Sequence, residues 1–125
     1  MEEQWRFLLI DGANDRYWLA MMAEALRPLG TLTVAAETDA LQSNRLDTCD
    51  LVIVDAAAVT DITRFLLGLR ECRPTPKIIV ATASPTWTRA REAFKAGATD
   101  YIRKSLDPQE LRAAVLGALK KSRPS

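Results

Sequence analysis

Five short apolar segments alternate with segments of helical periodicity along this chain, and the alternation limits the folds available to it. The apolar segments predict strands at 5–10, 32–36, 51–54, 77–81 and 99–103. Apolar residues spaced i, i+3, i+4 and i+7 predict the intervening helices. These helices are expected at about 15–26, weakly at 38–46, from 62 to before Pro74, from 86 to Gly97, and from Asp107 onward.

Strict alternation of strands and helices is typical of a parallel sheet with helices on both faces. Right-handed crossovers and five strands favour the flavodoxin-like order 2-1-3-4-5, so the predicted fold is an α/β three-layer sandwich with five helices. A chain of 125 residues is the size of one domain. We expect that domain to occupy 1–121, with a polar tail at 122–125.

The last helix carries a strong start signal. Asp107 is predicted as its N-cap, Pro108 as its first residue and Glu110 as the third. Leu106 and Leu111 flank the cap at the spacing of a hydrophobic staple. This helix is therefore expected to bury Leu111, Ala114, Val115 and Ala118, and the first helix Leu19, Met22, Ala23 and Leu26. Trp5 and Trp18 are expected to serve in packing, and Trp87 and Phe94 are expected to be core or partly exposed packing residues and not a cofactor site.

Composition excludes several kinds of chemistry. The chain has no histidine, which removes Ser–His and Cys–His nucleophiles and nearly all zinc sites. A net charge of +1 indicates no general attraction to nucleic acid, and no apolar run reaches the roughly 18 residues of a membrane span. Cys49 and Cys72 are predicted to be reduced thiols, which indicates a cytoplasmic protein. The net charge and the short apolar runs lead us to expect that it neither binds nucleic acid nor enters a membrane.

Polar residues close four of the predicted strands. Asp11 follows the first strand, Asp55 the third, Thr82 the fourth and Lys104 the fifth. The carboxyl ends of parallel strands lie along one edge of the sheet, where ligands of such folds bind. Two carboxylates can share a magnesium ion, and a hydroxyl and an ammonium can receive an anion. The set describes a phosphoryl-acceptor site, where catalysis is mostly positioning and charge neutralisation.

Four stretches of the sequence resemble the receiver domain of two-component response regulators. They are LLID at 8–11, DLVIVD at 50–55, IIVATAS at 78–84 and AFKAGATDYIRKSLDPQEL at 93–111. The likeness covers essentially the whole chain, and its last stretch is the most specific.

The resemblance implies a role for each site residue. Asp55 would be the phosphoacceptor, and Mg²⁺ would be held by Asp11, Asp55 and the backbone carbonyl of Ala57. Lys104 would contact the phosphoryl group, Thr82 would be the switch hydroxyl, and Tyr101 the switch aromatic.

The resemblance also implies partners. A sensor histidine kinase or phosphotransfer protein would donate the phosphoryl group, and the switched face of the domain would bind a downstream effector protein. The domain would not be an enzyme in its own right and would contact no nucleic acid directly. Separately from the resemblance, a homodimer through the last two helices is an open alternative to a monomer.

The sequence departs from the family pattern at three places. Gly12 stands where a second acid is usual, Ser105 stands where proline usually follows the lysine, and Val59 and Thr63 replace a proline and a glycine. Asp15 lies near the acidic position but is interpreted as a helix cap. With one carboxylate fewer, the site would bind magnesium more weakly.

These departures leave an alternative open, a pseudo-receiver that binds partners without phosphorylation. A flavin- or nucleotide-binding domain is disfavoured because the chain has no glycine-rich phosphate loop.

Overall fold

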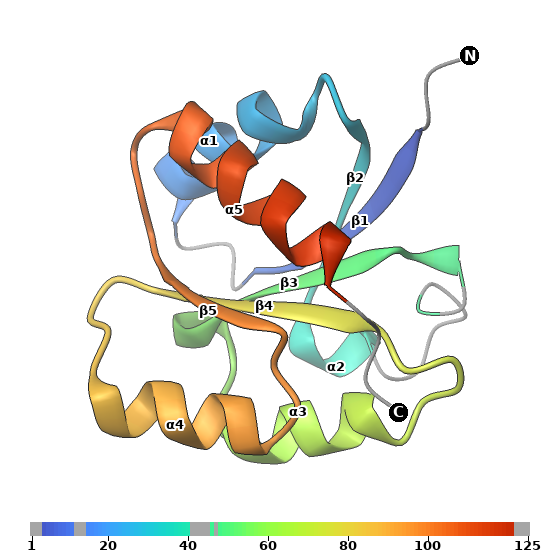
Figure 1. Ribbon diagram of the computed structural model, residues 1–125, viewed down its shortest axis with the longest axis vertical. Coiled ribbons are helices and arrows are strands. Elements are labelled where there is room, and N and C mark those ends of the chain that lie inside the picture. Colours follow the sequence, from blue (N-terminus) through green and yellow to red (C-terminus); the bar gives the residue numbers. More distant parts are fainter. Residues whose placement is uncertain (1–3, 12–14, 41–45, 47, 122–125) are drawn as a thin grey trace.

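The computed structural model describes residues 4–11, 15–40, 46 and 48–121, which form a five-stranded parallel sheet between two layers of helices (Figure 1). The strands are β1 (Trp5–Ile10), β2 (Gly30–Ala35), β3 (Leu51–Asp55), β4 (Lys77–Thr82) and β5 (Asp100–Arg103). Their order is β2-β1-β3-β4-β5, which confirms the predicted topology. β1 and β3 are neighbours although a helix pair and β2 separate them in sequence.

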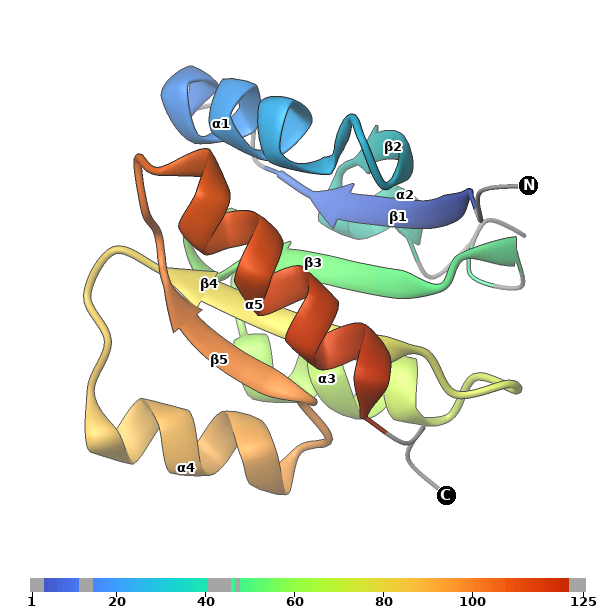
Figure 2. The same cartoon turned by 45° about the horizontal axis from the view of Figure 1, so that its top comes forward.

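Five α-helices cover the two faces of this sheet. They are α1 (Arg16–Leu26), α2 (Glu37–Ala40), α3 (Ile62–Arg70), α4 (Trp87–Lys95) and α5 (Pro108–Lys120), and a 3₁₀ turn, η2 (Ala56–Ala58), follows β3. Figure 2 shows α1 and α5 together on one face, with α3 and α4 on the other. Of the predicted second helix at 38–46, the structure describes α2 over Glu37–Ala40, and the part at 41–45 lies outside the described residues.

Alternation along the central strands divides the core into two halves. Phe7 and Leu9 of β1 pack beneath α1 and α5, whereas Leu8 and Ile10 pack beneath α2, α3 and α4. β3 is fully buried along its length, as its unbroken apolar run predicts for a strand covered on both faces. None of the described helices combines the length and apolarity needed to span a bilayer.

Side-chain caps fix where the helices begin. In four helices the capping side chain accepts a hydrogen bond from a backbone N–H of the first turn. These caps are Asp15 for α1, Asp61 for α3, Thr86 for α4 and Asp107 for α5. Such caps satisfy amide groups that have no partner within the helix. Because Asp15 and Thr86 start helices at the carboxyl-end edge of the sheet, these caps also set the surroundings of the candidate site.

Three packing predictions are wrong. Leu106 is 76% exposed, so no hydrophobic staple forms; instead Ser105 Oγ donates to Glu110. Trp87 is 85% exposed, because the inward side of α4 presents Ala93, whereas Phe94 is 48% exposed, in keeping with the expected partial exposure. The buried stripes of two helices also differ from prediction: α1 buries Trp18 and Ala25 in place of Leu19 and Ala23, and α5 buries Leu119 in place of Ala114.

Replacement of Gly97 by alanine is expected to destabilise the domain, because Gly97 has φ = 115° after α4. Steric space is not the limit, since the atom nearest to an added Cβ would lie 3.6 Å away on Arg70. The cost is therefore backbone strain, about 1–3 kcal/mol in the free energy of unfolding measured with urea. Gly117 is the matched control: within α5 nothing lies near its Cβ position, so Gly117→Ala should stabilise by about 0.5–1 kcal/mol. Equal effects of the two changes would contradict this account.

Candidate phosphoryl-acceptor site

Folding brings the four predicted polar residues to the carboxyl-end edge of the sheet. Ile10 pairs with Val54, so Asp11 and Asp55 follow paired residues on adjacent strands. Thr82 ends β4, and the backbone N–H of Lys104 donates to its carbonyl oxygen at 2.8 Å. The edge therefore presents two carboxylates, a hydroxyl and an ammonium.

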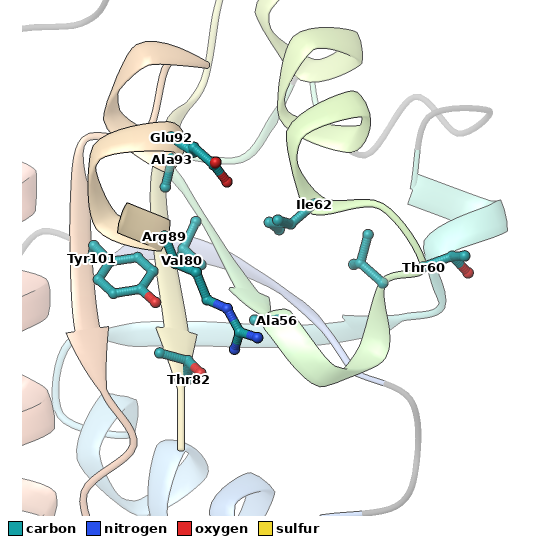
Figure 3. A pocket seen from close by; sticks show the side chains of 10 residues that line it. Ala56, Thr60, Ile62, Val80, Thr82, Arg89, Glu92, Ala93 and Tyr101 are labelled. Atoms are coloured by element: carbon teal, nitrogen blue, oxygen red, sulfur yellow. The ribbon is translucent and has the colours of Figure 1, made fainter. Parts of the chain in front are cut away.

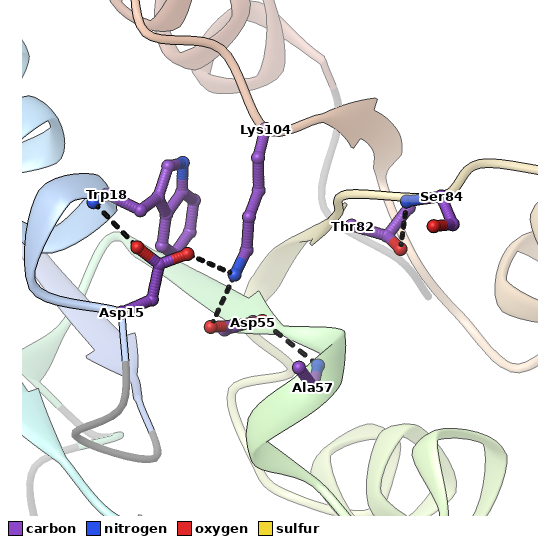
Figure 4. Close-up of polar contacts among 7 residues, drawn as sticks. All are labelled: Asp15, Trp18, Asp55, Ala57, Thr82, Ser84 and Lys104. Carbon is purple, nitrogen blue, oxygen red and sulfur yellow. Dashed lines mark hydrogen bonds and ion pairs between the residues drawn. The ribbon is translucent and has the colours of Figure 1, made fainter.

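Asp55 lies at the centre of this edge and is only 3% exposed. Its Oδ1 accepts from the backbone N–H of Ala57 at 2.9 Å, and its Oδ2 accepts from Lys104 Nζ at 2.8 Å (Figure 4). The first bond caps η2, and the second supplies a cation to a carboxylate removed from water. A buried carboxylate needs such partners, since an isolated buried charge costs several kcal/mol or more. Asp55 thus serves both as a cap and as an ion-pair partner.

Lys104 binds a second carboxylate. Its Nζ lies 3.0 Å from Asp15 Oδ2, and the ammonium sits 4.9 Å from the centroid of the Trp18 ring, within cation–π range. The lysine side chain is 11% exposed, so it is nearly enclosed by these three groups. Asp15 does form the predicted cap, because its Oδ1 accepts from the Trp18 N–H, but its bond to Lys104 was missed. The sequence did contain a signal for this bond, because Asp15 follows β1 closely and so lies at the same edge of the sheet as Lys104.

These contacts shift two pKa values in opposite directions. Burial alone would lower the pKa of Lys104, but hydrogen bonds to Asp55 and Asp15 outweigh it and raise that pKa above 10.5. The pKa of Asp15 is lowered below 3.8, first by the Trp18 N–H and then by Lys104. The contribution of Lys104 to the free energy of unfolding is therefore complete at a pH below its pKa in the unfolded chain. That contribution is lost as the pH rises through its pKa in the folded protein. Stabilisation linked to Asp15 is present above 3.8 and is lost as pH falls.

Asp11 retains an open acceptor. It is 7% exposed, and within the described part of the chain its Oδ1 is buried without a hydrogen-bond partner. The residue lines a hollow of about 490 Å³ with Arg16 and Asp39. The described residues contain no group of three Asp, Glu, His or Cys side chains placed to hold a metal. Two carboxylates at adjacent strand ends, one with an unused oxygen, nevertheless fit a magnesium ion that keeps several waters.

Thr82 and Tyr101 lie away from the ion pairs. Thr82 Oγ1 accepts from the Ser84 N–H at 3.1 Å, and both Thr82 and Tyr101 line a cavity of about 310 Å³ beside α4. Figure 3 shows the Tyr101 ring and the Arg89 side chain pointing into this cavity. Arg89 was not among the predicted site residues. The cavity offers the two predicted switch residues space in which to move.

Two smaller predictions concern the backbone. Ala57 contacts Asp55 through its N–H, so the structure shows a backbone interaction at the predicted position, and the role of its carbonyl stays a prediction. Within the described residues the cis peptide bond is Arg73–Pro74, so the Lys104–Ser105 bond is trans, as expected where serine and not proline follows the lysine.

Comparison with known proteins places the chain in a family. Residues 13–116 match the model of the response regulator receiver domain. The chain therefore belongs to the receiver domain family of two-component response regulators, which are signalling domains, and the predicted family and fold are confirmed.

Individual relatives agree with this assignment. The photosynthetic apparatus regulatory protein RegA of Rhodobacter capsulatus is 33% identical over 116 residues, covering 87% of this chain and 60% of RegA. This chain thus spans about 60% of the length of the curated relatives it matches. A putative response regulator from Chloroflexus aurantiacus is 26% identical with a TM-score of 0.81, covering 95% of this chain and all of that one. A response regulator from Thermotoga maritima, 23% identical with a TM-score of 0.82 over the same shares, supports the fold alone.

Removal of the Lys104 charge should expose the cost of burying Asp55. Lys104→Met leaves that carboxylate without its cation and is expected to lower the free energy of unfolding by about 3 kcal/mol at neutral pH. Adding Asp55→Asn should restore much of the loss, because a neutral amide needs no counter-charge. Urea unfolding of the two single variants and the double variant measures the coupling. Strictly additive effects would show that the ion pair does not neutralise Asp55.

Proposed function

We propose that this domain accepts a phosphoryl group on Asp55 and thereby switches a protein-binding face. The donor is a phosphohistidine of a sensor histidine kinase or phosphotransfer protein, and the recipient of the signal is a downstream effector. One observation carries the proposal: a buried carboxylate ends β3 in contact with an ammonium that reaches it from the end of β5. Family membership supports it, because receiver domains act with histidine kinases and effectors.

The transfer requires little from the protein beyond placement and charge. A carboxylate oxygen of Asp55 attacks phosphorus, the P–N bond to the imidazole breaks with its electron pair moving to that nitrogen, and an acyl phosphate results. Lys104 neutralises charge on the phosphoryl oxygens, and the Ala57 N–H holds the carboxylate in its direction of attack. Magnesium bound by Asp11, Asp55 and the Ala57 carbonyl would supply further positive charge at the same oxygens.

The switch is assigned to the cavity beside α4. The Thr82 hydroxyl, whose oxygen now accepts from the Ser84 N–H, would move to donate its hydrogen to a phosphoryl oxygen, and Tyr101 would move further into the space this opens. Such a local charge event favours one of two arrangements of α4, β5 and α5. Trp87 and Phe94 already expose large apolar surfaces on α4, which suits this face to an effector or to a second copy of the domain.

Incubation with a small-molecule phosphodonor and Mg²⁺ should add the mass of one phosphoryl group to the intact domain. Asp55→Asn should abolish the gain, because it removes the nucleophilic oxygen. Asp50→Asn is the matched control, since Asp50 precedes the same strand at the opposite edge of the sheet. Intact-mass spectrometry measures all three proteins. A gain that persists in the Asp55 variant would place the acceptor elsewhere.

A magnesium titration tests the metal assignment separately. Tryptophan fluorescence should respond to Mg²⁺, because Trp18 lies against Lys104 at the same site. Asp11→Asn should weaken that response at least tenfold in apparent affinity, since ligand charge sets the affinity of hard cations. The Asp50→Asn domain should titrate as wild type does. An unchanged affinity in the Asp11 variant would remove that residue from the metal site.

A second candidate function is a pseudo-receiver that binds its partner without phosphorylation. It is favoured by the absence of a three-acid metal cluster in the described residues and by the occupation of both Asp55 oxygens. It predicts that Asp55→Asn leaves the affinity for a captured partner unchanged, and a pull-down followed by a binding titration would measure this. A tenfold or greater loss on substitution would eliminate it.

A further inference from the structure

Asp15 uses its two carboxylate oxygens for different purposes. Oδ1 accepts from the Trp18 N–H at 3.0 Å and caps α1, whereas Oδ2 accepts from Lys104 Nζ at 3.0 Å. The cap holds the carboxylate against the first turn of the helix, and the Trp18 ring lies beside the ammonium. Lys104 is therefore held by α1 as well as by Asp55.

At this edge of the sheet, one ammonium is shared between two carboxylates before any modification. Asp11 and Asp15 follow β1 in the sequence, and Asp55 ends β3. Lys104 is bonded to two of these three carboxylates, those of Asp15 and Asp55. A phosphoryl group on Asp55 adds negative charge to the same place. Asp15 then becomes both a like charge near that group and a competitor for its cation.

We propose that Asp15 is a positioning residue that holds Lys104 in the unmodified state and so opposes the addition of a phosphoryl group to Asp55. The inference rests on the proposed function of Asp55. Lys104 Nζ now contacts the Asp55 oxygen itself at 2.8 Å. To contact the outer oxygens of a phosphoryl group it must shift its position, and the bond to Asp15 restrains that shift. Asp15 thereby sets how readily the domain is phosphorylated.

The cap and the ion pair can be separated by one substitution. In Asp15→Asn the side-chain oxygen still accepts from the Trp18 N–H, because asparagine is as good an N-cap as aspartate. The remaining amide NH₂ faces Lys104 and cannot accept from it. Asp61→Asn is the matched control, since Asp61 caps α3 through the same bond to the third residue on and has no described bond to Lys104. Urea unfolding of both variants verifies that each remains folded.

The experiment measures the affinity for beryllium trifluoride, a phosphoryl mimic that a receiver domain of the DrrB protein accepts, at saturating Mg²⁺ by tryptophan fluorescence. Wild type should bind it and Asp55→Asn should not. Asp15→Asn should bind about two- to fivefold more tightly, the range expected when one partly exposed charge pair is removed, and Asp61→Asn should match wild type.

The outcomes test the role of Asp15 and the proposed function of Asp55 separately. Tighter binding by Asp15→Asn alone supports the inference. Binding by wild type with equal or weaker binding by Asp15→Asn overturns the inference and leaves the proposed function intact. A gain of equal size in Asp61→Asn also overturns it, because the effect would then belong to helix capping. Absence of binding by wild type overturns the proposed function, and the inference with it.

Discussion

The ammonium of Lys104 is the contact on which the arrangement of the candidate site depends. It joins β5 to β3 through Asp55 and to α1 through Asp15, while the indole of Trp18 covers one side of it. A single cation thus connects three elements that are distant in sequence. Because Asp55 is almost fully buried, this cation cannot be removed without leaving a carboxylate in a poorly solvating environment. The burial of Asp55 and the proposed chemistry of the edge therefore both involve the same ion pair.

Burial gives that ion pair its strength and also its cost. The central strands place apolar side chains on both faces of the sheet, so the carboxyl end of β3 emerges from a dry core directly at Asp55. A charge in such a place interacts strongly with a neighbouring charge, since there is little water between them. The same condition makes Asp55 sensitive to the addition of further negative charge. Under the proposed function, such a site responds to a phosphoryl group by moving its cation.

Much of this could be predicted from the sequence, for identifiable reasons. The strand order follows from strict alternation, and the gathering of Asp55, Thr82 and Lys104 follows from the geometry of parallel strands. The high exposure of Trp87 could not be predicted, because helical periodicity does not reveal which side of α4 meets the sheet when a small residue, Ala93, fills the inner side. The second role of Asp15 was missed because its capping signal is local, whereas its partner lies 89 residues further along the chain.

The absence of a second acid at Gly12 has a physical consequence for this site. A receiver site with fewer carboxylates attracts magnesium less strongly, and the negative charge of Asp15 is directed instead toward Lys104. Asp15 thus places an additional carboxylate in this neighbourhood, where it is paired with the protein's own cation. A lysine that is restrained by one carboxylate and shared with another moves toward a new anion only when that anion outcompetes both. Under the proposed function, the balance between Asp15 and Asp55 for Lys104 decides whether the edge behaves as a responsive switch or as a fixed structural ion pair.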